Sequence, residues 1–220
     1  MKRLFKDNGL SLVLIAFFLI FWSGQAVCGF HERNADERQH GRPPVPFVDY
    51  LRSAHFLEAT FENWESEFLQ MAAYVILTVF LYQRGSAESK DPDEKEAVDD
   101  DVKKKKTHPS APRAVRAGGW RLKIYSHSLS LALCSLFLGC WLGHAWAGPS
   151  QYSTEQLEHG QPPISLLEYL GTSRFWFESF QNWQSEFVAV AAIVVLSIWL
   201  REKGSPESKP LAAPHSSTGS

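Results

Sequence analysis

The sequence has little cysteine and almost no net charge. Among its 220 residues only Cys28, Cys134 and Cys140 are cysteines, and they form neither a C-x-x-C pair nor the spacing of a zinc site. Each lies in or beside an apolar run, so we expect all three to pack as small hydrophobic residues. The formal net charge of −2 argues against a nucleic-acid-binding protein, which needs a basic patch.

Catalytic and nucleotide-binding signatures are also missing. The chain has no H-E-x-x-H, G-x-S-x-G, P-loop or G-x-G-x-x-G pattern. His40 and His159 each begin an H-G-x-P-P string, which we interpret as a turn because Gly and Pro specify one. A metal needs three or four converging ligands, and only Asp49 and Glu168 are matching partners for these histidines. We therefore expect no catalytic, cofactor-binding or metal-binding residues and no cofactor.

Charge is absent altogether from four apolar blocks. They cover residues 10–27, 68–81, 129–146 and 187–200. The first and third have 18 residues, within the roughly 17–25 that cross a bilayer as a helix. The second and fourth have 14, but starting them at Asn63 and Asn182 gives helices of about 31 Å. Trp64 and Trp183 would then lie at a membrane interface, which suits their half-polar rings.

Four transmembrane helices follow from these blocks. We predict them over about residues 9–28, 63–83, 127–147 and 182–201. The N-terminal arm, the segment 84–126 and the chain after Leu200 hold 17 of the 22 Lys and Arg residues, with 11 acidic residues. The segments 28–67 and 148–186 hold the other five, with 13 acidic residues. By the positive-inside rule, both termini face the cytoplasm and the acidic segments face outward.

A cleaved signal peptide over residues 1–28 is the alternative for the first block. Its apolar run is longer than the usual ~7–15 residues, and no A-x-A cleavage site follows it. We therefore expect the first block to remain in the protein as a helix.

An internal repeat supports that expectation. Residues 8–90 (the first copy) align without a gap to residues 127–209 (the second copy), and 33 of the 83 pairs are identical. The first predicted helix corresponds to the third, which lies in the middle of the chain. Because each copy holds two crossings, we expect parallel repeats related by an axis along the membrane normal.

The repeat also sets the domain boundaries. Repeat 1 covers residues 1–90 with an outward segment at 29–62, and repeat 2 covers residues 121–209 with an outward segment at 148–181. Between them, residues 91–120 form a charged cytoplasmic linker that we expect to be disordered, like the tail at 210–220. Its run from Lys103 to Lys106 is a solvated linker or a contact for anionic lipid.

Each outward segment follows one plan. A short helical piece comes after H-G-x-P-P, and in the second copy Ser165 and Glu168 fit a capping box. An aromatic stretch follows, made of Phe56, Phe61, Phe175, Trp176, Phe177 and Phe180. We interpret it as an interfacial helix on the outer leaflet; the alternative is a ligand groove lined by the aromatic rings.

The duplicated N-W-x-S-E-F string is the most specific local motif. Its residues are Asn63, Trp64, Glu67, Asn182, Trp183 and Glu186. The asparagines suit helix N-caps, the tryptophans suit the interface, and the glutamates suit the positive end of the helix dipole. The functional alternative is that both glutamates enter the bilayer edge and mark an ion or proton path.

The strings F-x-N-W-x-S-E-F and RGSAESK resemble those of an uncharacterised family of bacterial integral membrane proteins, a domain of unknown function. The resemblance covers nearly the whole chain. It implies a small bacterial inner-membrane protein with about four helices, and it contributes no substrate, activity or site residue.

Together these features predict an all-α, polytopic membrane protein. We expect four transmembrane helices, arranged as two parallel two-helix repeats with outward interfacial helices. The expected role is non-enzymatic, structural or in interactions, with the lipid bilayer and either a second copy or another membrane protein as partners. A small-solute or ion transporter or channel is the alternative, and a membrane enzyme using outward His and Glu residues is a third hypothesis.

Overall fold

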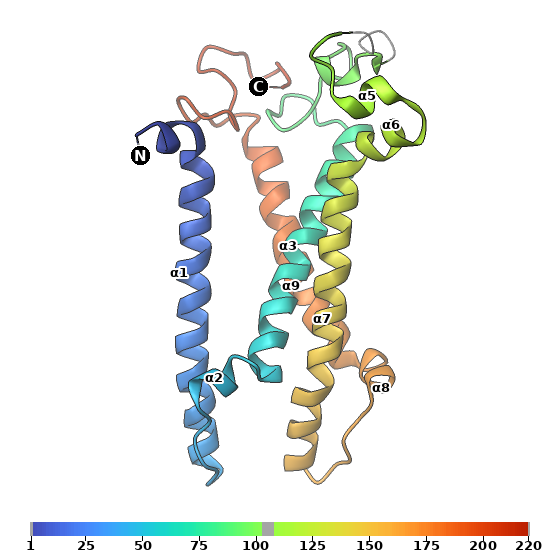
Figure 1. Ribbon diagram of the computed structural model, residues 1–220. Coiled ribbons are helices and arrows are strands. Elements are labelled where there is room, and N and C mark those ends of the chain that lie inside the picture. The colour runs from blue at the N-terminus through green and yellow to red at the C-terminus, as the bar shows by residue number, and fades with distance from the viewer. Residues whose placement is uncertain (1, 103–107, 220) are drawn as a thin grey trace. The chain divides into compact units, whose positions relative to one another are not determined.

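The computed structural model describes residues 2–102 and 108–219, and all regular structure in these residues is helical. This confirms the all-helical prediction. The long helices are α1 (Lys2–Gln39), α3 (Ala54–Phe80), α7 (Ser128–Glu158) and α9 (Ser173–Leu196) (Figure 1). The short ones are α2 (Phe47–Tyr50), the 3-10 helix η1 (Ala97–Asp99), α5 (Arg113–Ala117), α6 (Gly119–Ser126) and α8 (Leu166–Leu170).

The chain divides into two compact units. Unit 1 comprises Met1–Thr60 and Gly143–Tyr169, and unit 2 comprises Phe61–Leu142 and Leu170–Ser220. Within the described residues, α1 over Arg3–Gln39 and α7 over Ser128–Glu158 are long and apolar enough to cross a membrane. Only 6% and 17% of their apolar windows are buried, so most of these side chains lie open.

Helices α1 and α7 extend past the ends of the predicted crossings. The apolar runs end near residues 28 and 147, but the helices continue to Gln39 and Glu158. An ion pair between Arg33 and Glu37, one turn later, stabilises the polar extension of α1 as a helix, with an N–O distance of 2.5 Å. Each outward segment therefore begins as a continuation of the preceding long helix.

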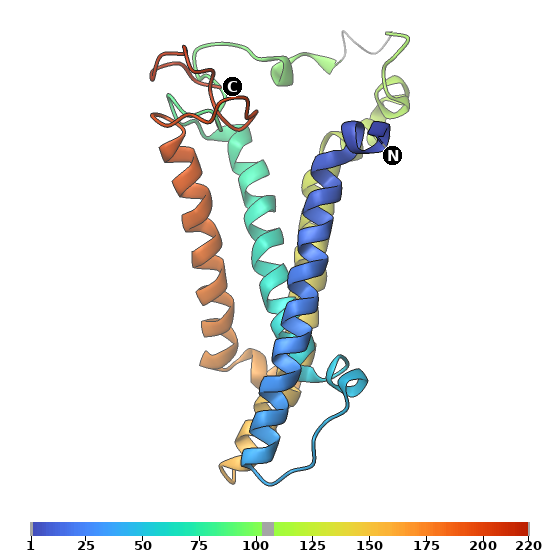
Figure 2. The ribbon, with the colours of Figure 1, turned by 90° about the vertical axis from the view of Figure 1, so that its left-hand side faces the viewer.

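In unit 1 the chain leaves α1, turns at Gly41 and returns to the short helix α2 (Figure 2). Asn34 fixes this return: Val45 N donates to Asn34 Oδ1 at 2.6 Å, and Asn34 Nδ2 donates to Val45 O at 3.1 Å. Ser153 aligns with Asn34 and has the same role in the second copy, because Ile164 N donates to its Oγ at 3.1 Å. Both returns thus depend on one polar side chain of the preceding helix.

The return places a tyrosine against a helix backbone in each copy. Tyr50 is buried against Gly29, and Tyr169 is buried against Gly148. A Cβ atom at either glycine would overlap the tyrosine side chain, so the close approach requires glycine. Tyr50 also joins the core of Ala26 and Phe56.

The aromatic stretches are not separate interfacial helices, so that prediction is wrong. They form the first turns of α3 and α9, which begin at Ala54 and Ser173. Hydroxyl side chains cap these helices: Phe56 N donates to Ser53 Oγ, and Phe175 N donates to Thr172 Oγ1, each at 3.3 Å. The caps let one continuous helix run from the aromatic stretch into the apolar block.

The described residues of the two segments expected to be disordered include turns and short helices. The linker holds η1 and α5, and the lysine run 103–106 lies outside the described residues. In unit 2 the chain after Arg201 wraps around Lys209, whose ammonium donates to the carbonyls of Gly85, His215 and Ser217 at 2.5 to 3.0 Å. The chain wraps around Lys209 because a buried ammonium needs several acceptors, and the carbonyls of the tail supply them.

Candidate functional site

The two motif asparagines do not cap helices, and that prediction is wrong. Asn63 and Asn182 lie in the interiors of α3 and α9, about nine residues after each helix begins. Each accepts a bond at its backbone carbonyl from a serine three residues later, Ser66 and Ser185, at 2.7 and 2.8 Å. The asparagine side chains therefore do not cap these helices, and their role depends on the residues that they contact.

In unit 2 the second copy's motif residues bond to carboxylates of α3. Trp183 Nε1 donates to Glu65 Oε1 at 3.1 Å, and Asn182 Nδ2 donates to Glu62 Oε1 at 2.5 Å. Glu65 is fully buried. The aromatic ring of Phe137 on α7 packs edge-on against Trp183, with ring centroids 6.2 Å apart. The motif of α9 therefore forms a polar seam with α3.

The remaining motif residues take different places. Trp64 packs edge-on against Phe61 of its own helix, and Asn63 is exposed. Glu67 is exposed and Glu186 half-buried, and the two carboxylates lie within electrostatic range of each other. Of the motif residues, the structure thus brings Asn182 and Trp183 into contact with acids of α3. These acids, Glu62 and Glu65, align with glutamines in the second copy.

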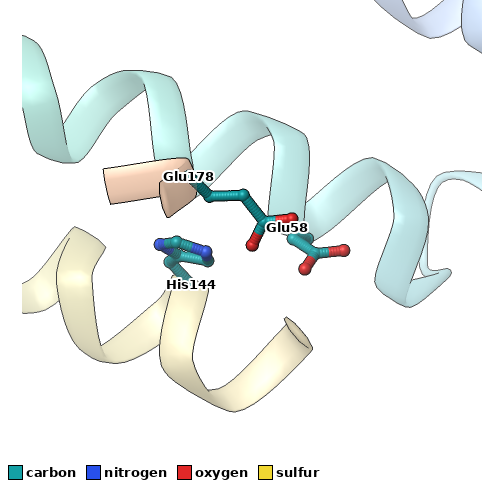
Figure 3. Close-up of side chains that lie close together, drawn as sticks. All are labelled: Glu58, His144 and Glu178. Atoms are coloured by element: carbon teal, nitrogen blue, oxygen red, sulfur yellow. The ribbon is translucent and has the colours of Figure 1, made fainter. Parts of the chain in front are cut away.

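A second polar cluster lies inside unit 1. His144 on α7 and Tyr169 on α8 are fully buried, and Glu58 on α3 is only 8% exposed. Tyr169 Oη donates to Glu58 Oε1 at 3.0 Å. The ligand atoms that Glu58 and His144 offer lie within 4.8 Å of each other (Figure 3). Glu178, also labelled there, belongs to unit 2 and accepts a bond from Arg174 on α9.

Comparing the copies does not reveal this cluster, because it is not duplicated. His144 aligns with Gln25, and Glu58 aligns with Phe177. A search for ligand residues that occur in both copies therefore finds neither His144 nor Glu58. The usable signal is a histidine within an otherwise uncharged apolar block, since polar groups in such runs are commonly functional.

The turn histidines behave as expected. His40 Nδ1 bonds the carbonyl of Asp36 at 3.0 Å, and His159 Nδ1 bonds the carbonyl of Glu155 at 2.8 Å. Both contacts close the last turn of a helix, as basic side chains commonly do. The turn interpretation of these histidines is confirmed.

An ion-pair network lies at the same end of unit 1. Arg42 bonds Glu37 at 2.6 Å and Glu158 at 2.7 Å. The hydrogen bond from Glu158 raises the pKa of the Arg42 guanidinium above its ordinary value. Arg42 thereby joins the turn of the first copy to the end of α7.

A family described as "Domain of unknown function (DUF6766)" matches residues 1–220. The chain belongs to this family. Neither a curated protein nor a solved structure matches it. The DUF6766 assignment confirms the expected resemblance to a domain of unknown function, and it assigns no role to the seam of unit 2 or to the buried cluster of unit 1.

Proposed function

We propose that this DUF6766 member is an integral membrane protein that crosses the bacterial inner membrane four times and has a non-enzymatic, structural or interaction role. The observation that carries the membrane location is the open apolar surface of α1 and α7. Leu10, Ile20 and Phe21 are 61–76% exposed on α1, and Leu129 and Leu142 are each 60% exposed on α7. Such surfaces are stable in lipid and costly in water.

Two further features support four crossings. The apolar blocks of α3 and α9 follow the same plan, with a polar seam at one end and basic residues after the other. The two copies also share their local geometry: positive φ angles occur at Gly41 and Gly160, and again at Gly85 and Gly204. Shared geometry at a constant spacing supports the duplication and hence equal numbers of crossings in each copy.

The topology is tested with single cysteines at two exposed positions, Ser110→Cys and Ser150→Cys, in a background without the three native cysteines. An impermeant thiol reagent applied to intact spheroplasts should label residue 150 and not residue 110. The reverse pattern would overturn the proposed orientation. Labelling of both positions would overturn the four-crossing arrangement.

The interaction role is tested on exposed aromatic residues of α9. Trp176, Phe177 and Phe180 are 39–65% exposed, and changing all three to Ser should abolish self-association or the binding of a membrane partner. Native mass spectrometry of the nanodisc-embedded protein would show this loss. If the variant keeps the same assembly state and the same bound proteins, this surface has no such role.

Transport is a second candidate function, favoured by the acidic residues of α3. A buried carboxylate such as Glu65 within a membrane helix commonly marks an ion or proton path, and Glu67 and Glu186 lie close to the same seam. The double variant Glu67→Gln and Glu186→Gln should abolish proton flux into liposomes reported by a pH-sensitive dye. Glu202→Gln, an exposed carboxylate after α9, is the control that should retain it.

A further inference from the structure

We propose that α6 lies along the cytoplasmic membrane surface and binds the headgroups of anionic phospholipids. The proposal rests on the proposed membrane location and adds to it the class of lipid that this surface selects. In unit 2, α6 ends directly before α7, one of the two helices that are long and apolar enough to cross a membrane. The side chains of α6 therefore lie at the depth of the lipid headgroups.

A break in the backbone separates α6 from α7. His127 has φ −119° and ψ 12°, outside the helical region, so α6 and α7 are two helices rather than one (Figure 1). The first copy has a similar break at the aligned residue, since Asn8 has φ −136° and ψ 17°. A straight continuation of α7 would carry the preceding residues away from the bilayer, whereas a break lets them lie against it.

Two exposed apolar side chains form a ridge along α6. Trp120 is 69% exposed and Ile124 is 52% exposed. They are four residues apart and so share one face of the helix. An indole ring this exposed favours the lipid–water interface, because it is apolar and has a polar N–H group. The ridge therefore suits the boundary between acyl chains and headgroups.

Basic side chains flank this ridge. By the helical period of 3.6 residues per turn, Arg121 lies on one side of it and Lys123 on the other. The Arg121 guanidinium also lies 5.6 Å from the centre of the Trp120 ring, as a cation–π contact. Helices that lie in the interface place their rings in the acyl boundary and extend their cations to the lipid phosphates. The arrangement on α6 matches that geometry.

The charge of this region has one sign. Residues 108–127 contain four Lys and Arg residues and no Asp or Glu. The four are Arg113, Arg116, Arg121 and Lys123; all are exposed, and none forms an ion pair with the residues that the structure describes. An anionic lipid supplies the opposite charge, and each basic residue near such a surface strengthens binding roughly fivefold. A zwitterionic headgroup carries its own cation and gains less.

The aligned segment of the first copy is partly neutralised. Arg3 forms an ion pair with Asp7, one turn later, at 3.6 Å, and Asp7 aligns with Ser126. Phe5, which aligns with Ile124, is 62% exposed. Both copies thus have an exposed apolar side chain before the break, but of the two segments α6 alone combines its cations with no acid. We therefore assign the contact with anionic lipid to α6.

The test compares two lipids on the full chain in detergent. Native mass spectrometry would follow titrations with dioleoylphosphatidylglycerol, which is anionic, and with dioleoylphosphatidylcholine, which is zwitterionic and has the same acyl chains. The wild type should bind the first lipid more tightly. The double variant Arg121→Gln and Lys123→Gln should weaken phosphatidylglycerol binding roughly 10–30-fold and leave phosphatidylcholine binding unchanged. The matched control, Arg38→Gln with Arg52→Gln, removes two exposed charges from unit 1 and should keep the wild-type preference.

Two further measurements separate charge from folding. Circular dichroism should show equal helicity in all three proteins, because the changed side chains are exposed. The wild-type preference should fall as the salt concentration rises, since exposed charges are screened.

Equal affinity of the wild type for both lipids, or a preference that survives in the α6 double variant or in 1 M salt, would overturn the contact. These results would leave the four-crossing proposal intact, because that proposal depends on the labelling of residues 110 and 150. Labelling of both positions would overturn the crossings whatever the lipid preference.

Discussion

In the first copy Tyr50 lies against Gly29, and in the second copy Tyr169 lies against Gly148. The two pairs stand at aligned positions, and so do Asn34 and Ser153, which fix the returning chain. The copies differ at other positions: where one has the half-buried Gln25, the other has the fully buried His144. Aligned side chains that make the same contact in both copies hold the backbone, whereas the buried imidazole of His144 belongs to one copy alone.

The largest effect is expected at the two glycines that contact the buried tyrosines. Gly29→Ala and Gly148→Ala should each destabilise the protein by about 1–3 kcal/mol, because the methyl group overlaps a buried tyrosine. Gly24→Ala is the control, since nothing lies within 4 Å of a Cβ atom there, and Ala favours a helix. Thermal unfolding in detergent would measure all three. Similar Tm values for Gly29→Ala and Gly24→Ala would refute the close packing.

Asn34 and Ser153, which hold the returning chain in the two copies, should contribute unequally to the free energy of unfolding. Asn34→Ala removes both bonds to Val45 from a side chain that is only 5% exposed, and should cost about 1–3 kcal/mol. Ser153→Ala removes longer bonds of 3.1 and 3.5 Å to Ile164, and should cost about 0.5–1.5 kcal/mol. Chemical unfolding curves would rank them. A larger loss at Ser153 would contradict the structure.

Lys90 and Lys209 occupy aligned positions with opposite surroundings. Asp99 raises the pKa of Lys90, whereas burial lowers the pKa of Lys209. Lys90 therefore adds stability that is complete below its unfolded pKa of about 10.4 and is lost as the pH rises through its folded value. Lys209 has the opposite sign, because its unfolded state binds more protons, so its contribution grows as the pH rises toward about 10.4.

Methionine variants separate these two lysines. Lys209→Met should expose the chain after residue 210 to limited proteolysis, because the carbonyls of His215 and Ser217 lose their donor. Lys90→Met should leave the tail protected. Mass spectrometry of the digests would show the cleavage site, and equal protection in both variants would exclude the proposed role of the Lys209 ammonium.

The smallest effect is expected at Arg42, which aligns with Gln161. Arg42→Gln removes the bonds to Glu37 and Glu158 from a partly exposed side chain. The Tm should fall slightly in low salt and match that of the wild type in 1 M salt, where exposed ion pairs are screened. A large loss that persists in high salt would show that Arg42 has a packing role.

Apolar blocks and local turn signals predicted part of the fold. The all-helical class, the turns at His40 and His159 and the capping box at Ser165 are confirmed, the last by a 2.7 Å bond from Ser165 N to Glu168 Oε2. The starts of α3 and α9 were missed because the aromatic stretches suit both an interfacial helix and the first turns of a longer one. Only the capping hydroxyls of Ser53 and Thr172 distinguish these arrangements.

The candidate sites were less predictable. Glu58 and His144 are 86 residues apart in the sequence, and neither has a polar counterpart of the same type in the other copy. Their approach depends on how α3 and α7 pack, which hydrophobic periodicity does not specify. The seam between Glu65 and Trp183 has the same origin: the motif identified the donor, but only packing identifies its acceptor.

The contact between Tyr50 and Gly29 also bears on the order of folding. Its partners are 21 residues apart in the sequence, so the loop that must close is short and its entropic cost is small. Contacts this local form early, because they need no distant part of the chain. We expect the hairpin of α1 and α2 to close as soon as residue 50 has left the ribosome, before α7 has been synthesised.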